Sequence, residues 1–511
     1  MQKNNLTKFL NSINEVKFLQ ENIKKNLKEN IRIIKKKIAF DQSFDLLSRE
    51  FKIGRKKAVL FYIDGFIDDK LIFILNSLMG SENDKGIVND LKKIKSKLLP
   101  YYEISLVDNF DEAISELLSG TQILFIEGEK KVLVIDGRSW LSRSPEEPEL
   151  EKATRGPADG FVETMLFNVA AVRRRIRDVN FRAEAIQVGK RSKTDIALVY
   201  MDDIVNPELL KRIKSKLNSV DLDGLPLADK SVEEIITSGT INPLPLVRYT
   251  ERPDNVAAHI LEGNIAILVD NSPTALILPA PFFSHIQTLE IFRKGVINGS
   301  YLSFMRIFAI LISVFLPAIW LLAVKNKEML PDFLYFIGVK EESTIGLGVQ
   351  FILASIGIDL IRMASIQTPS SLATSLSLVG ALLLGDFAVK VGLFSPEVIL
   401  YMAISVLANF SIPGYELALS LKLFRLVILL GVIIGNIWGF VIVVFALFLF
   451  TVFTKSFGVY YLWPLIPFDY QALKSYTLRQ SILDLSHMRP SAYKTKDSDR
   501  MAKNDKEEGG K

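Results

Sequence analysis

Three charged side chains inside an apolar stretch are the residues of this sequence whose chemistry stands out first. The stretch GALLLGDFAVKVGLFSPE, residues 380–397, carries Asp386 and Lys390 one helical turn apart, and Glu397 follows soon after. An ionisable side chain near a bilayer centre costs about 2.5–3.5 kcal/mol on insertion scales unless it faces protein, water or a partner. Residues of this kind indicate either ion pairs between helices or a polar path through a membrane.

A second pair of opposite charges lies in the apolar stretch before it. Asp359 and Arg362 are three residues apart, and Asp386 and Lys390 are four residues apart. Both spacings place the two charges on one helix face, where they can pair and so lower the cost of burial. A pair that faced lipid would still be costly, so we expect these faces to point at other protein or at water.

Two interpretations of these charges stay open. They are either structural salt bridges that tie helices together or the polar lining of an ion or solute path. One chain with about four or five membrane segments encloses a pore poorly, whereas a ring of copies would enclose one and bury the charges between subunits. The candidate ion-path or helix-pairing residues are Asp359, Arg362, Asp386, Lys390, Glu397 and Glu416.

The elements that must position these charges are apolar segments in the C-terminal half. Segments long and apolar enough to cross a bilayer are 304–324, 345–366, 372–394 and 423–453, the last with tilt or with a bend at Gly431 or Gly435. Residues 395–410 are too short to cross comfortably, and we predict that they are re-entrant. The prediction is an all-α polytopic membrane domain with about four crossings plus a re-entrant segment.

The N-terminal half contains an internal repeat. In the first pair of matching stretches, a strand ends in an acidic turn: KAVLFYIDGFIDDKL (57–71) and DIALVYMDDIVNPEL (195–209). In the second pair, a helix ends at a glycine and leads into a strand: FDEAISELLSGTQILFIEG (110–128) and PDNVAAHILEGNIAILVDN (253–271). Glycine just past a helix is the usual left-handed cap. The repeat predicts a cytosolic α/β region made of two similar modules.

These patterns divide the chain into six predicted regions. They are a basic helical N-terminus (1–40), a first α/β module (41–140), a linker with a basic helix (141–184), a second α/β module (185–290), a transmembrane domain (291–470) and a disordered cytoplasmic tail (471–511).

The linker helix ends in a run of arginines. Arginine suits a helix C-terminus, so a solvated basic end is one interpretation. The other is a face that contacts a neighbouring domain, a subunit or lipid. The candidate residues for such a contact are Arg155, Gly156, Glu163, Asn168, Arg173 and Arg174.

Charge and composition limit the partners of the 511-residue chain. Charged residues make up 23% and hydrophobic residues 49%, but Lys and Arg gather at the two ends, and so does most of the net charge of +5. These ends suit solvated tails near anionic lipid. With no motif and no interleaved aromatic residues, nucleic-acid binding is not expected.

The motifs of common enzymes are missing. The sequence has no Walker A, no GxGxxG that opens a helix after a strand, no HExxH and no GxSxG. Cys is absent, and His259, His285 and His487 are scattered, so we expect no enzyme activity, cofactor or metal site. The N-terminus lacks the apolar region of a signal peptide, and the N-terminal half is therefore expected in the cytoplasm.

Two long motifs stand out, RGPADGFVETMLFNVAAVRRRI in the linker and QTPSSLATSLSLVGALLLGDFAVKVGLFSPEVILYMAISVLANFSIPGYELALSLKLFRL (367–426) in the membrane half. Both resemble the GerA family of bacterial spore-germination proteins. The stretches FYIDGFIDD, LVDNSPTALILPAPFFSHIQ and DLIRMASIQTPSSLA are similar to one branch of that family. The resemblance covers about residues 40 to 470.

The resemblance implies a multi-pass protein of the spore inner membrane with a two-part cytoplasmic N-terminal region. Receptor A subunits of the family are thought to assemble as oligomeric ion channels. The branch is thought to act with a partner membrane protein as a channel that amplifies germination and calcium-dipicolinate release. The alternatives are an A subunit of a nutrient germinant receptor and a non-conducting membrane scaffold for germination partners.

Overall fold

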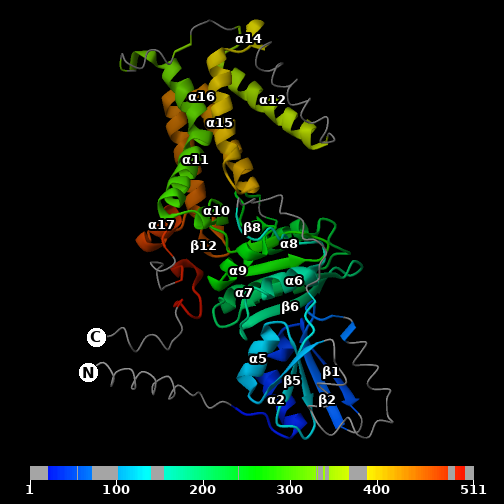
Figure 1. Ribbon diagram of the computed structural model, residues 1–511. Coiled ribbons are helices and arrows are strands. Elements are labelled where there is room, and N and C mark those ends of the chain that lie inside the picture. The colour runs from blue at the N-terminus through cyan, green and yellow to red at the C-terminus, as the bar shows by residue number, and fades with distance from the viewer. Residues whose placement is uncertain are drawn as a thin grey trace, which may run out of the picture.

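Two sheet modules and a helical bundle follow one another along the molecule in the computed structural model (Figure 1). The structure describes residues 21–53, 56–68, 70–71, 102–139, 155–239, 241–329, 331, 338–339, 344–367, 388–481 and 489–500. The first module lies at one end, the second module in the middle and the bundle at the other end. We call the end of the bundle beside the second module its module side, and the opposite end its far side.

The first module is an antiparallel five-stranded sheet with the order β1-β2-β4-β5-β3. Its strands are β1 (Leu46–Ile53), β2 (Lys56–Ile63), β3 (Glu103–Val107), β4 (Gln122–Ile126) and β5 (Val132–Asp136). Alternate residues of β2 point to opposite faces, so Val59 and Phe61 enter one core cluster while Leu60 enters another. Two helices, α2 (Leu27–Lys37) and α5 (Phe110–Leu118), cover the face that carries Phe61.

Residues 21–39 of the basic N-terminal segment belong to this module and are not a separate region. Residues 27–37 do form a helix, and the side chain of Asn26 caps its first amides. The apolar face of the helix is buried in the first core, where Ile34 is fully inaccessible. The division at residue 40 is therefore wrong for residues 21–39, because the lysines occupy only the outer face of an amphipathic helix.

The second module repeats the topology of the first. Its strands are β6 (Phe181–Val188), β7 (Thr194–Met201), β8 (Arg248–Thr250), β9 (Ile265–Val269) and β10 (Ala275–Leu278), in the order β6-β7-β9-β10-β8. Helices α6 (Met165–Arg173) and α9 (Pro253–Leu261) cover one face, and α7 (Pro207–Asn218) and α8 (Ala228–Thr237) cover the other.

The predicted repeat therefore corresponds to two sheets with the same strand order. The first matching stretches form β2 and β7, and the second form α5–β4 and α9–β9. The matching glycines also agree, since Gly120 has φ +103° and Gly263 has φ +98°. A side chain at either position would strain the left-handed cap.

The bundle consists of α11 (Val296–Lys325), α12 (Leu347–Gln367), α15 (Pro396–Phe410) and α16 (Tyr415–Phe453), preceded by the short α10 (Leu289–Arg293). By length and composition, α11, α12 and α16 are long and apolar enough to cross a membrane. Most of the predicted segment 372–394 lies outside the described residues, which resume at 388 with the short α14 (Ala388–Lys390). The number of crossings stays a prediction.

Helix α16 bends back on itself at Asn436, where φ is +51° and ψ is −130°. The rings of Phe424 and Phe450 lie 6.5 Å apart, whereas a straight helix would separate these positions by about 39 Å. The bend falls one residue past Gly435, one of the two predicted positions. Asn tolerates a positive φ, and the side-chain amide of Asn436 exchanges two hydrogen bonds with that of Asn326 at the end of α11.

Helix α15 runs from the far side of the bundle to its module side (Figure 1), and whether this segment is re-entrant in a membrane stays a prediction. At the far side, the Ser395 amide donates to the side chain of Gln350 near the start of α12, at 2.8 Å. After α15 ends, the turn to α16 reaches the second module, where Gly414 packs against the backbone of His285. Helix α15 is short, but the irregular turn after it completes the path from the far side to the second module. The length of the apolar segment alone does not predict this turn.

The C-terminal region is ordered where the structure describes it. The chain leaves α16 through β11 (Lys455–Ser456) and β12 (Val459–Tyr460), and α17 (Tyr470–Thr477) follows. Residues 489–500, with a short 3-10 turn η7 (Ser491–Tyr493), lie on the second module. The prediction of a disordered tail is wrong for these parts, because Trp463, Tyr476 and Tyr493 pack their rings together.

Candidate functional site

An ion pair joins two helices of the bundle. The Lys422 Nζ on α16 lies 2.6 Å from a carboxylate oxygen of Asp359 on α12. The two side chains remain 18% and 28% exposed in the single chain. Counting about 1.5 Å per residue, the pair lies roughly 10–12 Å from the module-side ends of both helices. The predicted pairing of Asp359 with Arg362 is therefore wrong, because Asp359 pairs with Lys422 of another helix.

The other cations near this pair have separate contacts. The guanidinium of Arg362 lies over the ring of Tyr415, 4.7 Å from its centre. Arg425, on the next turn of α16 after Lys422, is only 2% exposed and donates to the Ser313 carbonyl of α11 at 3.4 Å. Two neighbouring turns of α16 thus direct cations at α12 and α11, so each apolar helix gains a polar contact with the next.

The remaining membrane candidates do not gather at this pair. Asp386 lies outside the described residues, and Lys390 and Glu397 flank the far-side turn before α15. Glu416 is exposed at the start of α16, where it lines a pocket of about 190 Å³ together with Tyr249 and His285. The charges therefore form separate groups at the far side, within the bundle and at the module side.

A buried ion pair locks the two modules together. Arg173, the last residue of α6, donates through Nε and Nη2 to both carboxylate oxygens of Asp45, and each side chain is 1% exposed. The guanidinium also lies 4.3 Å from the centre of the Phe181 ring. Beside this pair, the Phe44 amide donates to the Ala183 carbonyl at 3.0 Å. The interpretation of a solvated basic helix end is thus wrong for Arg173.

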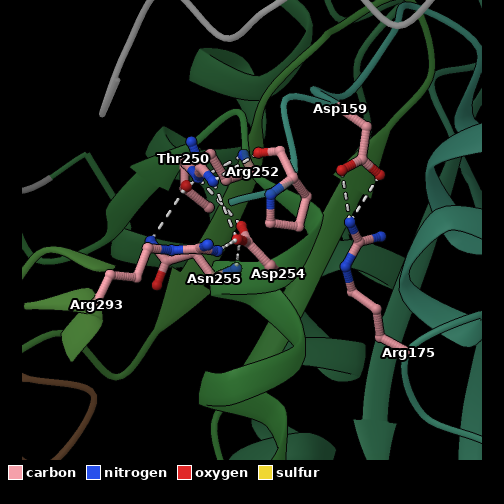
Figure 2. Close-up of polar contacts among 8 residues, drawn as sticks. Asp159, Arg175, Thr250, Arg252, Asp254, Asn255 and Arg293 are labelled. Atoms are coloured by element: carbon pink, nitrogen blue, oxygen red, sulfur yellow. Dashed lines mark hydrogen bonds and ion pairs between the residues drawn. The ribbon is translucent and has the colours of Figure 1, made fainter. Parts of the chain in front are cut away.

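A second cluster ties the linker to the membrane domain at Asp254 (Figure 2). Arg252 donates to both oxygens of Asp254, at 3.1 and 3.0 Å, and Arg293 reaches the second oxygen at 2.9 Å. The Nη2 of Arg252 also donates to the Pro157 carbonyl at 3.0 Å. Arg293 ends α10 just before α11 begins, so one carboxylate connects the linker, the second module and the base of the bundle.

Gly156 is fitted to this cluster. Its φ is +121°, and a Cβ there would lie 1.4 Å from a guanidinium nitrogen of Arg293. Asn168 holds the neighbouring turn, because its side chain accepts from the Val162 amide and donates to the Val162 carbonyl. Of the other linker candidates, Arg155, Glu163 and Arg174 are exposed.

A pocket of about 460 Å³ opens where the linker helix faces the first module. Gly65 and Phe66 line it from the first module, and Arg174 and Arg177 line it from the end of α6. Arg175 also lines it but donates to both oxygens of Asp159, at 2.7 and 2.6 Å (Figure 2). The acidic turn after β2 is therefore part of a pocket wall, and its surroundings are cationic.

Two histidines lie near Arg248 at the module side of the bundle, where His285 is buried and His259 is half-buried. Burial, and after it the charge of the nearby Arg248 guanidinium, lower the pKa of both His259 and His285 from 6.5 to about 3. Arg248 is held in place by the carbonyls of Ser284 and Gln287, at 2.5 and 2.9 Å. Among the described residues, no group of three or more His, Asp or Glu could hold a metal ion.

Sequence reasoning missed Lys422, Asp45 and Asp254. Lys422 carried a signal, because it is a cation in an apolar segment and its sign complements that of Asp359. No sequence signal marked Asp45 or Asp254, since each lies in an ordinary turn or helix start. Each acquires its partner only when distant segments of the chain meet.

The chain combines two repeated α/β modules with a charged, polytopic helical bundle. Its similarity to known proteins places it in the class of spore-germination membrane proteins. The chain belongs to the family described as Bacillus/Clostridium GerA spore germination protein, whose model matches residues 33–492. This confirms the family indicated by the motifs.

Individual relatives cover most of the chain. Stage V sporulation protein AF of Bacillus subtilis (strain 168) is 40% identical over 450 residues, which are 88% of this chain and 91% of that protein. Spore germination protein KA of the same organism is 30% identical over 465 residues, covering 89% and 85%. The crystal structure of the N-terminal domain of the A subunit of the Bacillus megaterium spore germinant receptor GerK3 is 34% identical, covers 51% of this chain and 98% of that chain, and has a TM-score of 0.41.

Proposed function

We propose that copies of this protein assemble in the spore inner membrane and form or gate an ion path that promotes or amplifies germination and calcium-dipicolinate release. In this proposal the two modules face the cytoplasm, and other germination membrane proteins are partners. Membership of the GerA family and the similarity to Stage V sporulation protein AF support the germination role.

The single observation that carries the ion path is the partly exposed pair of Asp359 and Lys422. A charge pair within a membrane-spanning segment is stable only beside protein or water, and in one chain these side chains keep an open face. A neighbouring copy or an aqueous path would remove that cost. Helix α12 is the site proposed for this contact, because Leu353, Leu360 and Met363 on the same helix as Asp359 are also exposed in the single chain.

The junction at Asp254 gives the modules a means to act on this path. Arg293 binds the carboxylate two residues before Gly295, the N-cap of α11. A movement of the second module is therefore transmitted directly to the first helix of the bundle. Gating by the modules requires such a rigid connection, and surface ion pairs alone would be too weak to provide it.

The test is the conductance of purified full-length protein in planar bilayers. We expect wild-type protein to conduct and Asp359→Ala to reduce the current at least about tenfold, since the variant leaves Lys422 as an unbalanced cation beside the path. The matched control is Glu290→Ala, which breaks an ion pair with Lys294 on α10, outside the bundle. This control should leave the current unchanged.

Electrically silent wild-type protein would contradict the ion path and favour a non-conducting scaffold. Equal currents from wild type and Asp359→Ala would exclude the ion pair from the path. Thermal unfolding of each variant distinguishes loss of conduction from loss of the fold.

A further inference from the structure

The C-terminal segment 489–500 occupies a position on the second module that the first module fills with its own chain. In the first module, the Ser139 amide donates to the Phe66 carbonyl at 3.0 Å. In the second module, the Lys496 amide donates to the carbonyl of Ile204 at 2.9 Å. Phe66 and Ile204 are matching residues of the repeat, so the tail supplies the bond that residue 139 supplies in the other copy.

A second contact gives the same register. A Cβ placed on Gly120 would lie 3.2 Å from Phe66 and 3.4 Å from the side chain of Arg138. A Cβ placed on the matching Gly263 would lie 3.3 Å from Ile204 and 2.3 Å from the side chain of Thr495. Thr495 and Lys496 thus stand where Arg138 and Ser139 stand in the first module.

The second module cannot fill this position itself, because its own chain is directed elsewhere. The pairing of β9 with β10 has the same register as that of β4 with β5, so Pro281 and Phe282 are the counterparts of Arg138 and Ser139. The Phe282 amide donates instead to the Tyr461 carbonyl, just past α16, at 2.8 Å. The Ala280 amide donates to the Ser456 hydroxyl at 2.9 Å. The segment that would close the module is used to bind the base of the bundle.

The site on the second module that residues 489–500 fill is rich in hydrogen-bond acceptors, and this segment is basic. The Lys496 Nζ donates to the Asp202 carbonyl at 2.6 Å, and Arg500 reaches Glu262 at 2.7 Å. Arg489 donates to the Leu261 carbonyl at 3.0 Å. The segment is a loop whose ends meet, since the Arg489 amide donates to the Ser498 carbonyl at 2.6 Å and its guanidinium to the Asp497 carbonyl at 2.9 Å. This complementarity selects a loop with basic residues at both ends and in the middle.

The contacts are those of a releasable segment. In 489–500, Tyr493 is the one side chain that is described and buried, at 4% exposure. The ion pairs are open to solvent, since Lys496 and Asp202 are each 41% exposed. Exposed ion pairs are individually weak and are screened by salt. Attachment to the same chain keeps the local concentration high, so docking persists without a large interface.

We propose that residues 489–500 are a releasable docking peptide for the second module, bound in the same chain at the groove between Asp202 and Gly263. The docked peptide completes the module and fastens it to the C-terminal end of the membrane domain. Release would expose an acceptor-rich groove that fits a basic loop.

The first test is a disulfide in the full-length protein, which has no native cysteine. The Thr495 Cβ lies 3.7 Å from the Cβ position of Gly263, within the range of about 3.5–4.5 Å for a disulfide. We expect mild oxidation to form an intrachain bond in Gly263→Cys/Thr495→Cys. The control, Gly120→Cys/Thr495→Cys, carries the same backbone strain and should form the intrachain disulfide at least about tenfold less.

The second test needs no strained position and uses hydrogen exchange of the tail amides. We expect Glu262→Arg to raise the exchange rate of residues 489–500 several-fold, Glu262→Arg/Arg500→Glu to restore protection, and added salt to raise exchange in the wild type. The control Glu234→Arg alters an exposed carboxylate of α8 and should change nothing.

The proposal would be overturned if Gly263→Cys/Thr495→Cys formed no more disulfide than Gly120→Cys/Thr495→Cys and if Glu262→Arg left the exchange rate of residues 489–500 unchanged. Disulfide-linked dimers would overturn its commitment to the same chain and assign the peptide to a neighbouring copy. Neither readout depends on conductance.

Discussion

At the scale of single residues, burial decides how much each charge contributes. Arg173 and Asp45 are almost completely excluded from water and share two hydrogen bonds, so each satisfies the charge of the other. Lys190 and Asp221 form an ion pair at 2.5 Å that is about 70% exposed on both sides. A surface pair of this kind contributes about 0–1 kcal/mol, whereas loss of one member of a buried pair strands a charge.

We therefore expect Asp45→Ala to destabilise the protein by about 3–5 kcal/mol, because Arg173 would remain buried without its carboxylate. Thermal and denaturant unfolding of the full-length protein measure the change. Asp221→Ala is the matched control and should stay within about 0.5 kcal/mol of wild type. Equal effects from the two substitutions would contradict the assignment of Arg173 as the lock between the modules.

The low pKa values of His259 and His285 predict an acid-sensitive fold. In the folded state the pKa of His259 and of His285 is about 3, whereas in the unfolded chain it is 6.5. The unfolded state therefore binds more protons below pH 6.5, and stability must fall as pH drops from about 6.5 towards 3, by at most about 1.4 kcal/mol per pH unit for each histidine. The variant His259→Gln/His285→Gln should show a flatter fall in melting temperature between pH 7 and pH 5. An unchanged slope would mean that other groups cause the acid sensitivity.

At the scale of elements, the hairpin of α16 depends on small residues at the contact between its two arms. A Cβ on Gly439 would lie 2.0 Å from the carbonyl oxygen of Gly431, which is backbone and cannot move aside. A Cβ on Gly435, close to the bend, would meet no atom within 4 Å. The close approach is the kind that glycine permits between helices in a membrane.

Gly439→Ala should accordingly destabilise the protein by roughly 1–3 kcal/mol, since the two arms must separate. Gly435→Ala makes the same chemical change without a clash and should be neutral. The melting temperatures of both variants in detergent provide the comparison. A neutral Gly439→Ala would show that α16 does not fold back as described.

Periodicity and repetition in the sequence predicted elements better than they predicted contacts. Matching stretches revealed the duplicated modules because each copy must bury the same alternating strand faces. Apolar runs located both ends of α12 and α15 and the end of α11 to within two residues, but not the start of α11. The partner of Asp359 was missed because spacing favours a neighbour on the same helix, while Lys422 reaches it only through packing of α16 on α12. Tyr493 was missed because one aromatic residue in a polar tail has no periodicity.

At the scale of the whole molecule, Asp254 joins parts that could otherwise move independently. Its carboxylate holds Arg293 of α10 and Arg252, which in turn holds the linker at Pro157 (Figure 2). Asp159 lies in the same linker but binds Arg175 of the region just after α6 instead. The two carboxylates provide a matched pair for testing the connection.

We expect Asp254→Ala to raise hydrogen exchange both in residues 155–160 and in α10, since the shared anchor is lost. Asp159→Ala should raise exchange in the linker only. Both are measured by peptide-level exchange of the full-length protein. If Asp254→Ala left α10 as protected as in the wild type, the second module would not be rigidly connected to α11 through this carboxylate.

In the proposed path, ions pass beside Asp359 and Lys422, and the reversal potential in a KCl gradient reports the charge that they meet there. The charge swap Asp359→Lys/Lys422→Asp keeps an ion pair between α12 and α16 but exchanges the position of each charge. We expect this variant to stay folded and conducting, with a reversal potential shifted from that of the wild type. A folded, conducting swap with an unchanged reversal potential would contradict the proposed path.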